Sequence, residues 1–582
     1  MSPKQPKSIH EISGESENNS SDSHLITKRS NRLWPELSPL SKEGRLGWVS
    51  CFATGILTFM SFPNAWSPDL NLFWMMWFSH VPLMLFLWGR TPKSGALWGF
   101  ICGFIINTGG YYWIGELIIT FGQLPMPIAG LGLCLHSALV GLIWGIWGGL
   151  ICFLCPKWDI RWIAPIAMVV AEHFMPRIFP AYMGNCQYPW IEIMQIADLL
   201  GVSAVTFLLY RINAEIFIWL KQWKGQPVIH DAKKGKIGLW VTLSMMLLSI
   251  IYGVIRIQQI DTMSTNAPKI KVGVVEADVG IALTETREKL RNNLLTLQNL
   301  SADLVHRGAE LIIWSESAYR ASRFPVDLPR VKPSNRPLVD HWKKDQKTPR
   351  FDRITPLRGF KAPLLLGATA IDPKEKNYRK VYNSAWLLDQ EGVVQGRYDK
   401  IYRLVFGEYI PFGDTFPIFY KWLPSASRLE QGEKIEPLIL KRENQQIRIG
   451  VLICYEGILP EFSRELLKTD PDVLVNITND AWFGLSAERY LHFALALPRA
   501  IESRRGFIRG TLTGVSAYVD PVGRIVSWTK PKDKETLLEE VPLMRPWTLY
   551  QVIGDLFPKI LLLVLFILIV KQYSLNQQQT AT

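Results

Sequence analysis

Three residues of complementary chemistry lie at the ends of predicted strands in the polar part of the chain. Glu316 and Cys454 each close an apolar run, Leu311–Glu316 and Arg448–Cys454, and Lys400 follows a predicted strand pair. A carboxylate can take a thiol proton, the thiolate can attack an acyl carbon, and an ammonium can stabilise the oxyanion that develops. Either charge alone would be interpreted as a solvated strand end. Together, the three side chains predict acyl-transfer chemistry.

Cys454 stands apart from the other cysteines, because no other lies between Ala267 and Pro546. The remaining six lie in or beside apolar segments: Cys51, Cys102, Cys134, Cys152, Cys155 and Cys186. A lone thiol in this part of the chain cannot form an intradomain disulfide, and a free cysteine is often kept for its reactivity. A strand-to-turn junction would expose such a nucleophile on a rigid backbone. The alternative is a buried structural cysteine at the end of a core strand.

Alternating strands and helices would position these residues. Strands are expected at Ile270–Val275, Leu311–Trp314, Leu364–Gly367, Ser384–Leu388, Ile449–Ile453 and Val473–Ile477. Glu285–Arg307 has the apolar spacing of an amphipathic helix, and Phe507–Val526 alternates like paired strands around a turn at Asp520–Gly523. None of the nine histidines has a position comparable to those of Glu316, Lys400 and Cys454. The pattern predicts a single α/β domain over 267–540.

The composition indicates that the chain also has a membrane part. Aliphatic and aromatic residues make up 48% of the 582 residues and charged residues only 20%, and 23 tryptophans suit a membrane interface. Apolar stretches occur at about 46–62, 71–89, 95–119, 127–155, 161–176, 193–220, 237–256 and 548–570. Most of them approach the roughly 20 residues that a helix needs to cross a bilayer. We therefore expect a multi-pass bundle of about eight spans, with a membrane domain over 45–258 and a last span over 547–571.

Basic residues mark alternate loops between the apolar stretches. They are Arg45, Arg90, Lys93, Lys157, Arg161, Lys221, Lys224, Lys233, Lys234 and Lys236. The loops 63–70 and 120–126 contain no Lys or Arg. Because Lys and Arg concentrate in cytoplasmic loops, the tails 1–44 and 572–582 are expected in the cytoplasm, the first of them disordered. The α/β domain, inserted before the last span, would then lie on the outer side.

Three further features allow more than one interpretation. Ionisable residues lie within or beside the apolar stretches, and pairing between helices is the plainer interpretation for Glu116, Glu172, His173, Asp198, Arg211 and Glu215. Cys152 and Cys155 have only the spacing of a redox pair. The basic segment 320–361 either gathers anionic phospholipid headgroups or is a solvated insertion.

The net charge of +13 does not indicate a nucleic-acid partner. Much of the excess lies in short loops beside apolar segments, as membrane topology requires. No zinc-ligand spacing, Gly-rich phosphate loop or RNA-binding signature accompanies it. The predicted acyl-transfer chemistry calls for no metal and no cofactor.

The sequence resembles the apolipoprotein N-acyltransferase family of the nitrilase superfamily over about 45–570. The runs that carry the resemblance are Trp314–Ala318, Tyr398–Lys400, Phe406–Pro411, Ile453–Glu456, Asn476–Gly484, Arg499–Arg505, Thr513–Ala517 and, in the membrane part, Gln195–Ser203. In combination these motifs are specific. The resemblance implies a nitrilase-like α/β sandwich for the extramembrane domain.

The same resemblance implies a role for each matching residue. Glu316 would be the general base, Lys400 the oxyanion stabiliser and Cys454 the nucleophile. Glu408 would be an accessory carboxylate that orients Lys400 or the substrate amine. Tyr455 and Glu456 would shape the pocket beside the thiol, and Trp482 and Phe483 would line an apolar rim that opens at the bilayer surface.

The implied reaction has two steps at the outer face of the bacterial inner membrane. Cys454 would take an acyl chain from a phospholipid as a thioester and release a lysophospholipid. The N-terminal amine of a diacylglyceryl-cysteine on an apolipoprotein would then accept the chain, which completes lipoprotein maturation.

The chain departs from the family pattern in four places. They are Val275–Asp278, Ile401–Val405, Glu488–His492 and Thr511–Thr513. These departures bear on substrate preference rather than on the chemistry. Two other functions remain open from the sequence: a membrane-tethered nitrilase-type amidase, and a non-catalytic paralogue that binds lipoproteins.

Overall fold

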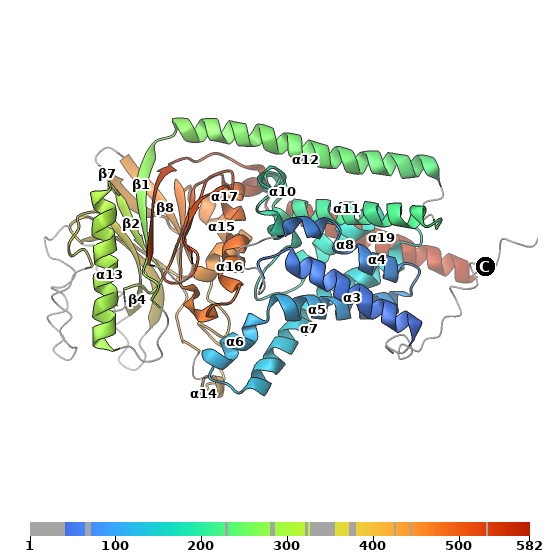
Figure 1. The fold of residues 1–582 in the computed structure, drawn as a ribbon, viewed down its shortest axis with the longest axis horizontal. Helices are drawn as coiled ribbons and strands as arrows, with labels where there is room; N and C mark the ends of the chain where they lie inside the picture. Colours follow the sequence, from blue (N-terminus) through green and yellow to red (C-terminus); the bar gives the residue numbers. More distant parts are fainter. Residues whose placement is uncertain are drawn as a thin grey trace, which may run out of the picture.

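A computed structural model describes residues 41–64, 72–226, 228, 231–279, 286–319, 324–325, 356–371, 380–423, 426–442, 445–530 and 534–581. Most of the expected N-terminal tail and most of the basic segment 320–361 lie outside these residues. A helical bundle and a domain with two β-sheets lie end to end along the longest axis of the molecule (Figure 1). The two parts meet where α10 (Ala197–Leu200) packs against α17 (Pro498–Ser503) and α18 (Leu549–Ile553), and where η2 (Met183–Gln187) packs against α16 (Glu488–Ala496).

The bundle gathers the helices of the first 266 residues and the last helix of the chain. The longer ones are α3 (Lys42–Met60), α5 (Pro92–Gly110), α7 (Met126–Leu154), α8 (Ile160–Phe174), α11 (Val202–Trp223), α12 (Ala232–Asn266) and α19 (Leu556–Ala581). The shorter ones are η1 (Phe73–Trp77), α4 (Val81–Leu87), α6 (Trp113–Thr120), η2 (Met183–Gln187), α9 (Ile191–Met194), α10 (Ala197–Leu200) and α18 (Leu549–Ile553). One apolar core joins α3, α4, α5, α7, α8, α11 and α19.

Helices α5 and α7 pack closely because each presents a row of glycines to the other. A Cβ added at Gly99 would lie 2.1 Å from the Trp144 carbonyl oxygen, and one at Gly148 would lie 2.4 Å from the Gly95 carbonyl oxygen. Small residues spaced by four let helix backbones approach each other in a membrane. The rows Gly95, Gly99, Gly103 and Gly141, Gly145 supply this spacing.

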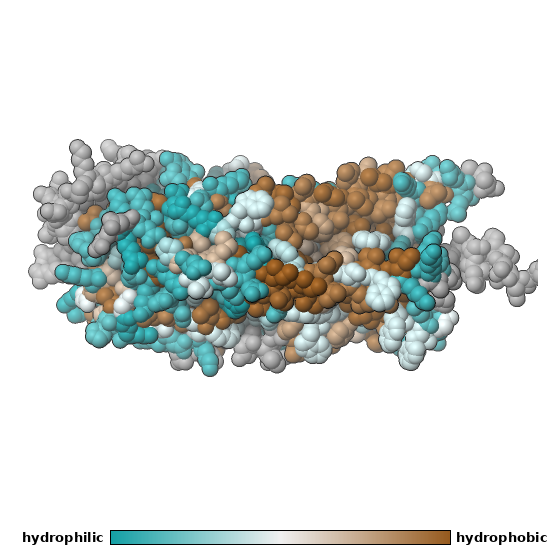
Figure 2. Space-filling view, turned by 90° about the horizontal axis from the view of Figure 1, so that it is seen from above, coloured by the Kyte–Doolittle hydropathy of each residue, from teal (hydrophilic) through white to brown (hydrophobic). Residues whose placement is uncertain are grey.

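Four helices in the described part of the chain are long and apolar enough to cross a membrane: α7, α11, α12 and α19. Figure 2 shows apolar side chains gathered over the bundle and hydrophilic ones over the β-sheet domain. The bulky side chains that α12 leaves exposed include Trp240, Leu247, Leu248 and Val254. A membrane bundle is therefore supported. The expected stretch 71–89 is divided into η1 and α4, 95–119 into α5 and α6, and 193–220 has the short helices α9 and α10 before the long helix α11.

The β-sheet domain is an α/β sandwich. One sheet has the strand order β13-β1-β2-β4-β5-β6, with β3 pairing on β4, and the other has the order β12-β11-β10-β9-β8-β7. The first sheet comprises β1 (Lys269–Glu276), β2 (Leu311–Trp314), β3 (Phe324–Pro325), β4 (Leu364–Ile371), β5 (Val381–Leu388), β6 (Val394–Asp399) and β13 (Glu535–Pro542). The second comprises β7 (Leu438–Arg442), β8 (Gln445–Ile453), β9 (Val473–Thr478), β10 (Phe507–Thr511), β11 (Ala517–Val519) and β12 (Ile525–Trp528).

Helices cover the outer faces of both sheets (Figure 1). Helix α13 (Arg287–His306) packs on β1, β2 and β13. On the side of the bundle lie α15 (Pro460–Leu467), α16 (Glu488–Ala496) and α17 (Pro498–Ser503), with the 3-10 turns η4 (Cys454–Ile458) and η5 (Asp480–Phe483). The short helix α14 spans Ile418–Trp422.

Alternation along the strands builds two cores. In β2, Leu311 and Ile313 face the core between the sheets, whereas Ile312 and Trp314 face α13. This division follows from the period of two along a strand. The strands β1, β2 and β4 are parallel neighbours, as are β8, β9 and β10. Their carboxyl ends therefore bring residues that are far apart in sequence to one edge of the sandwich.

Candidate active site

Glu316, Lys400 and Cys454 follow strands β2, β6 and β8. The Lys400 Nζ lies 4.0 Å from Glu316 Oε1 and 2.7 Å from Glu408 Oε2. Both Glu316 and Lys400 interact electrostatically with the Cys454 thiol. The structure thus brings together the three residues that the sequence analysis singled out, with Glu408 as the closer partner of the lysine.

Asn383 joins the two carboxylates of this cluster. Its Nδ2 donates to Glu316 Oε1 at 2.6 Å and to Glu408 Oε1 at 3.0 Å, and its backbone carbonyl accepts from the Lys400 N–H at 2.8 Å. Asn383 therefore holds the Glu316 and Glu408 carboxylates at a set distance from each other. It also holds the backbone at Lys400.

Cys454 begins the turn η4 with a φ of 52°, in the left-handed region that residues other than glycine rarely adopt. Such an outlier is a marker of functional sites, where the surrounding structure holds the backbone in place. Burial raises the pKa of the half-buried Cys454 thiol, and Glu316 raises it further, although Lys400 lowers it. The resting thiol therefore keeps its proton at neutral pH and needs a base.

Glu316 has the properties of that base. Burial raises the pKa of its carboxyl group, and Glu408 adds to the rise, against the opposing effects of Lys400 and Asn383. Its Oε2 is buried and has no hydrogen-bond partner among the described residues. A carboxylate oxygen that is buried and free can accept a proton without first breaking a hydrogen bond.

Lys400 keeps its positive charge in the site. Burial alone would lower the pKa of its ammonium group, but Glu408, Cys454 and Glu316 together raise it above its usual value. A permanently charged, buried ammonium beside the nucleophile is suited to stabilise an oxyanion.

Glu456 joins two loops through its hydrogen bonds. Its Oε1 accepts from Tyr398 Oη at 2.8 Å, the Ile401 N–H at 2.7 Å and the Tyr402 N–H at 3.0 Å. Its Oε2 accepts from the Ile453 N–H at 2.8 Å. The carboxylate therefore holds the backbone after Lys400 against the end of strand β8.

Tyr455 connects the nucleophile turn to the membrane part. Its hydroxyl donates to the Ile178 carbonyl, and its ring lies edge-on to Phe179 with centroids 6.2 Å apart. Ile178 and Phe179 lie between α8 and η2. The nucleophile thus sits beside the bundle rather than at the far end of the sandwich.

Trp482 and Phe483 have different environments. Trp482 is 43% exposed and its ring lies 5.0 Å from that of Phe121. Phe483 is buried, with its ring 5.1 Å from that of Trp113. Both aromatic rings therefore contact the bundle, but only Trp482 presents a large apolar surface to the surroundings.

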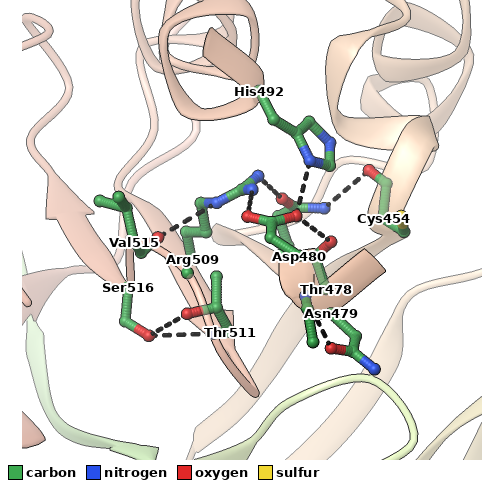
Figure 3. A network of polar contacts seen from close by, with 12 residues as sticks. Cys454, Thr478, Asn479, Asp480, His492, Arg509, Thr511, Val515 and Ser516 are labelled. Carbon is green, nitrogen blue, oxygen red and sulfur yellow. Dashed lines mark hydrogen bonds and ion pairs between the residues drawn. The ribbon is translucent and has the colours of Figure 1, made fainter. Parts of the chain in front are cut away.

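A second polar network, which the sequence analysis did not anticipate, lies beside the nucleophile (Figure 3). Asp480 accepts from Arg509 at 2.7 Å and pairs with His492 Nδ1 at 2.8 Å. Arg509 also donates to Asn476 Oδ1 at 2.8 Å, and the Asn476 amide donates to the Cys454 carbonyl at 3.3 Å. Burial alone would raise the pKa of Asp480, but Arg509 and His492 lower it to about 2. The charged network fixes the backbone of the nucleophile.

Two departures from the family pattern serve packing in this structure. Glu276 accepts hydrogen bonds from Thr511, Ser516 and Thr529, and so joins β1 of one sheet to the other sheet. Arg403 donates to the Leu429 carbonyl at 2.7 Å and covers the Tyr409 ring at 4.5 Å.

Two family models match this chain. Residues 54–214 match the family model of the apolipoprotein N-acyltransferase N-terminal domain, and 271–547 match that of carbon-nitrogen hydrolases. The chain belongs to the apolipoprotein N-acyltransferase family. The resemblance drawn from the motifs is confirmed, and the hydrolase match coincides with the two-sheet domain, confirming the nitrilase-like α/β fold.

Curated members of the family align over nearly the whole chain. The apolipoprotein N-acyltransferase of Geobacter metallireducens is 28% identical over 88% of this chain and 92% of its own length. That of Bdellovibrio bacteriovorus is 29% identical over 82% of this chain and 83% of its own. Apolipoprotein N-acyltransferase 2 of Leptospira interrogans is 27% identical over 88% of this chain and 94% of its own.

Proposed function

We propose that this protein transfers an acyl chain from a membrane phospholipid, through a thioester on Cys454, to the N-terminal amine of a diacylglyceryl-cysteine on an apolipoprotein. The observation that carries the proposal is the cluster of Glu316, Lys400 and Cys454 at three strand ends, beside the membrane bundle. Family membership supplies the acyltransferase class.

In the first half-reaction, Glu316 takes the proton from the Cys454 thiol as the sulfur attacks the ester carbonyl of the phospholipid. The carbon–sulfur bond forms, and the Lys400 ammonium stabilises the oxyanion. The intermediate collapses by breaking the carbon–oxygen ester bond. The departing alkoxide takes the proton back from Glu316, so that a lysophospholipid leaves and the thioester remains.

In the second half-reaction, the acceptor amine attacks the thioester carbonyl and gives a proton to Glu316. The carbon–sulfur bond breaks and the amide forms. Glu316 returns the proton to the Cys454 thiolate, which restores the resting enzyme. Glu408 takes part as an accessory carboxylate, since its 2.7 Å contact with Lys400 holds the ammonium in place through both steps.

The catalytic domain would lie on the periplasmic side of the bacterial inner membrane. Of about eight crossings, all but the last precede the domain and would deliver it there, and the last would return the C-terminus to the cytoplasm. Tyr455, Trp482 and Phe483 contact the bundle, which supports a site at the bilayer surface where both lipid substrates arrive.

Mass spectrometry of the purified protein after incubation with phospholipid tests the proposal. An acyl adduct on Cys454 and an equal amount of lysophospholipid are expected. Cys454→Ser should abolish the adduct, since an alkoxide forms far less readily than a thiolate. Glu316→Gln and Lys400→Ala should each remove most of it. Cys134→Ser is the matched control, because Cys134 is an exposed thiol outside the site.

Two results would contradict the proposal. One is an adduct that persists in Cys454→Ser. The other is release of free fatty acid without transfer to an apolipoprotein, which would indicate the amidase-type hydrolase instead.

A further inference from the structure

Asp198 of α10 is the centre of a buried ionic junction between two helices of the bundle and the catalytic domain. It is 1% exposed, and its Oδ2 accepts from Arg256 Nε at 2.8 Å and from Arg504 Nη2 at 2.8 Å. Its Oδ1 accepts from Tyr252 Oη at 2.6 Å. Asp198 belongs to the bundle, Tyr252 and Arg256 to α12, and Arg504 to the catalytic domain, where it follows α17.

Arg504 is saturated with hydrogen bonds to the segment around Asp198. Its guanidinium donates to the Asp198 carboxylate through Nε and Nη2, and to the Gln195 side chain through Nη1. It also reaches the carbonyls of Gln195 and Pro521, so that all five N–H groups have partners. Its backbone has a φ of 54°, a conformation that the surrounding contacts must hold.

The junction is only a few residues from the polar network of Asp480, Arg509 and Asn476 beside the nucleophile. Arg504 caps the end of α17 and begins the turn that leads into β10, and β10 carries Arg509. Arg509 holds Asn476, whose amide donates to the Cys454 carbonyl. A continuous set of polar contacts and one rigid strand therefore lead from Asp198 to the nucleophile turn.

The contacts between the two parts near the active site are of another kind. This side has ring contacts between Trp113 and Phe483 and between Phe121 and Trp482. It also has a hydrogen bond from Tyr455 to the Ile178 carbonyl and one from the Ala487 N–H to the Tyr112 hydroxyl. Ring contacts are weakly directional compared with a guanidinium that forms five hydrogen bonds. The Asp198–Arg504 ion pair is almost fully buried, whereas the Arg524–Asp261 pair on α12 is half-exposed.

We propose that Asp198 and Arg504 are positioning residues for lipid acyl transfer: they fix the catalytic domain on the membrane bundle so that the Cys454 turn meets lipid substrates at the bilayer surface. This role rests on the proposed function. It predicts that loss of the junction impairs reaction with a membrane-bound donor while the intrinsic reactivity of the thiol is retained.

The test compares two reactions of Cys454 in the full-length protein carrying Cys134→Ser. One is acylation by phospholipid in mixed micelles, and the other is alkylation by iodoacetamide. For Asp198→Asn we expect acylation to fall about tenfold or more, since a small misplacement can cost such factors. Alkylation should stay at the rate of the parent protein, and Asp198→Glu should recover part of the acylation. Asp261→Asn is the matched control, because Asp261 of α12 also pairs with a residue of the catalytic domain, Arg524 at 2.7 Å, but this pair is half-exposed and so contributes little.

Several results would contradict the positioning role. Equal loss of acylation and alkylation in Asp198→Asn would overturn the positioning role and indicate general damage to the fold. Acylation at the parental rate would also overturn it. If Asp198→Asn does not fold, Arg504→Lys and Tyr252→Phe replace it, and parental acylation in both would sink the idea. Absence of acylation in the parent protein would instead refute the proposed function.

Discussion

At the scale of single residues, the site contains two carboxylates, Glu316 and Glu408, that have the same chemistry but different surroundings. Glu408 lies 2.7 Å from the Lys400 ammonium and Glu316 lies 4.0 Å from it. The closer carboxylate neutralises and orients the lysine. The more distant one keeps an unpartnered oxygen and a raised pKa, which suits a group that must accept and return a proton twice in each cycle.

This division predicts the pH dependence of thioester formation. Glu316 must be ionised to take the thiol proton, so the rate should fall as the pH drops through its pKa, which burial places above the usual value of about 4.3. Because the pKa of Lys400 is raised, no loss from its deprotonation is expected below about pH 10. Single-turnover acylation measured against pH would give the acid limb.

Asn383 should affect the pH at which thioester formation begins to fall. Its amide lowers the pKa of Glu316, so Asn383→Leu should move the acid limb to higher pH and lower the maximal rate about tenfold or more. Asn266→Leu is the matched control, since Asn266 is exposed at the end of α12. An acid limb that stayed in place in Asn383→Leu would contradict the assignment of Glu316 as the base.

The sequence singled out the three residues that the structure brings together and missed those that hold them in place. Glu316, Lys400 and Cys454 follow apolar runs, and that position is visible in a single sequence. Asn383 is a strand residue whose side chain meets its partners only after β5 and β6 pair. His492 lies on helix α16, away from any strand end. The signals available in the sequence were an Asn within the predicted strand Val473–Ile477 and the charged residues Asp480 and Arg509 close to predicted strands.

At the scale of elements, the Glu456 clamp joins the loop after β6 to the end of β8. The four groups that hydrogen-bond to it are all donors, so the carboxylate is the acceptor they require. The two strands belong to different sheets. The clamp therefore sets the distance between Lys400 and Cys454 across the sandwich.

Glu456→Gln should damage both stability and catalysis. The new amide turns a donor toward groups that also donate, and an unsatisfied buried group costs about 1–3 kcal/mol. Thermal unfolding should shift downward, and thioester formation should fall by more than the folded fraction does. Glu461→Gln is the control, because Glu461 is exposed on the neighbouring helix α15. Unchanged acylation in folded Glu456→Gln would show that the clamp does not position the site.

Sequence periodicity located most strands but not the breaks in the apolar stretches. The stretch 193–220 is divided at Gly201, whose φ is 72° and whose Cα faces the Tyr550 ring. The stretch 71–89 is divided before α4, which has Pro82 in its first turn. Apolar composition alone does not reveal such breaks, because the contacts that hold them come from distant segments.

At the scale of the whole molecule, the aromatic contacts beside the site should matter for lipid but not for small reagents. Trp482→Ala with Phe483→Ala should reduce turnover of lipid substrates more than alkylation of Cys454. Removal of two large rings at the bundle contact opens the site to water and loosens the lipid path. Trp528→Ala, at a ring with 40% exposure elsewhere in the domain, is the control. Equal loss in both assays would indicate misfolding, and no loss in either would remove these rings from the site.

The topology makes a second prediction at this scale. A reporter that is active only outside the cytoplasm, fused after Asn266 at the end of α12, should be active. The same reporter fused after Lys224, at the end of α11, should be inactive, because basic residues mark that loop as cytoplasmic. The reverse pattern would overturn the orientation and the count of crossings.

The neighbourhood of β1 and β13 has a consequence for how the chain is made. These strands pair along their full length. However, β1 begins at Lys269 and β13 only at Glu535, so β1 is synthesised long before its partner. Until β13 is synthesised, one edge of β1 stays open to pairing with any other strand, which is a known route to aggregation. The catalytic sandwich can therefore close only when translation has nearly reached the final membrane helix, so that completion of the soluble fold and anchoring of the C-terminus are nearly simultaneous events.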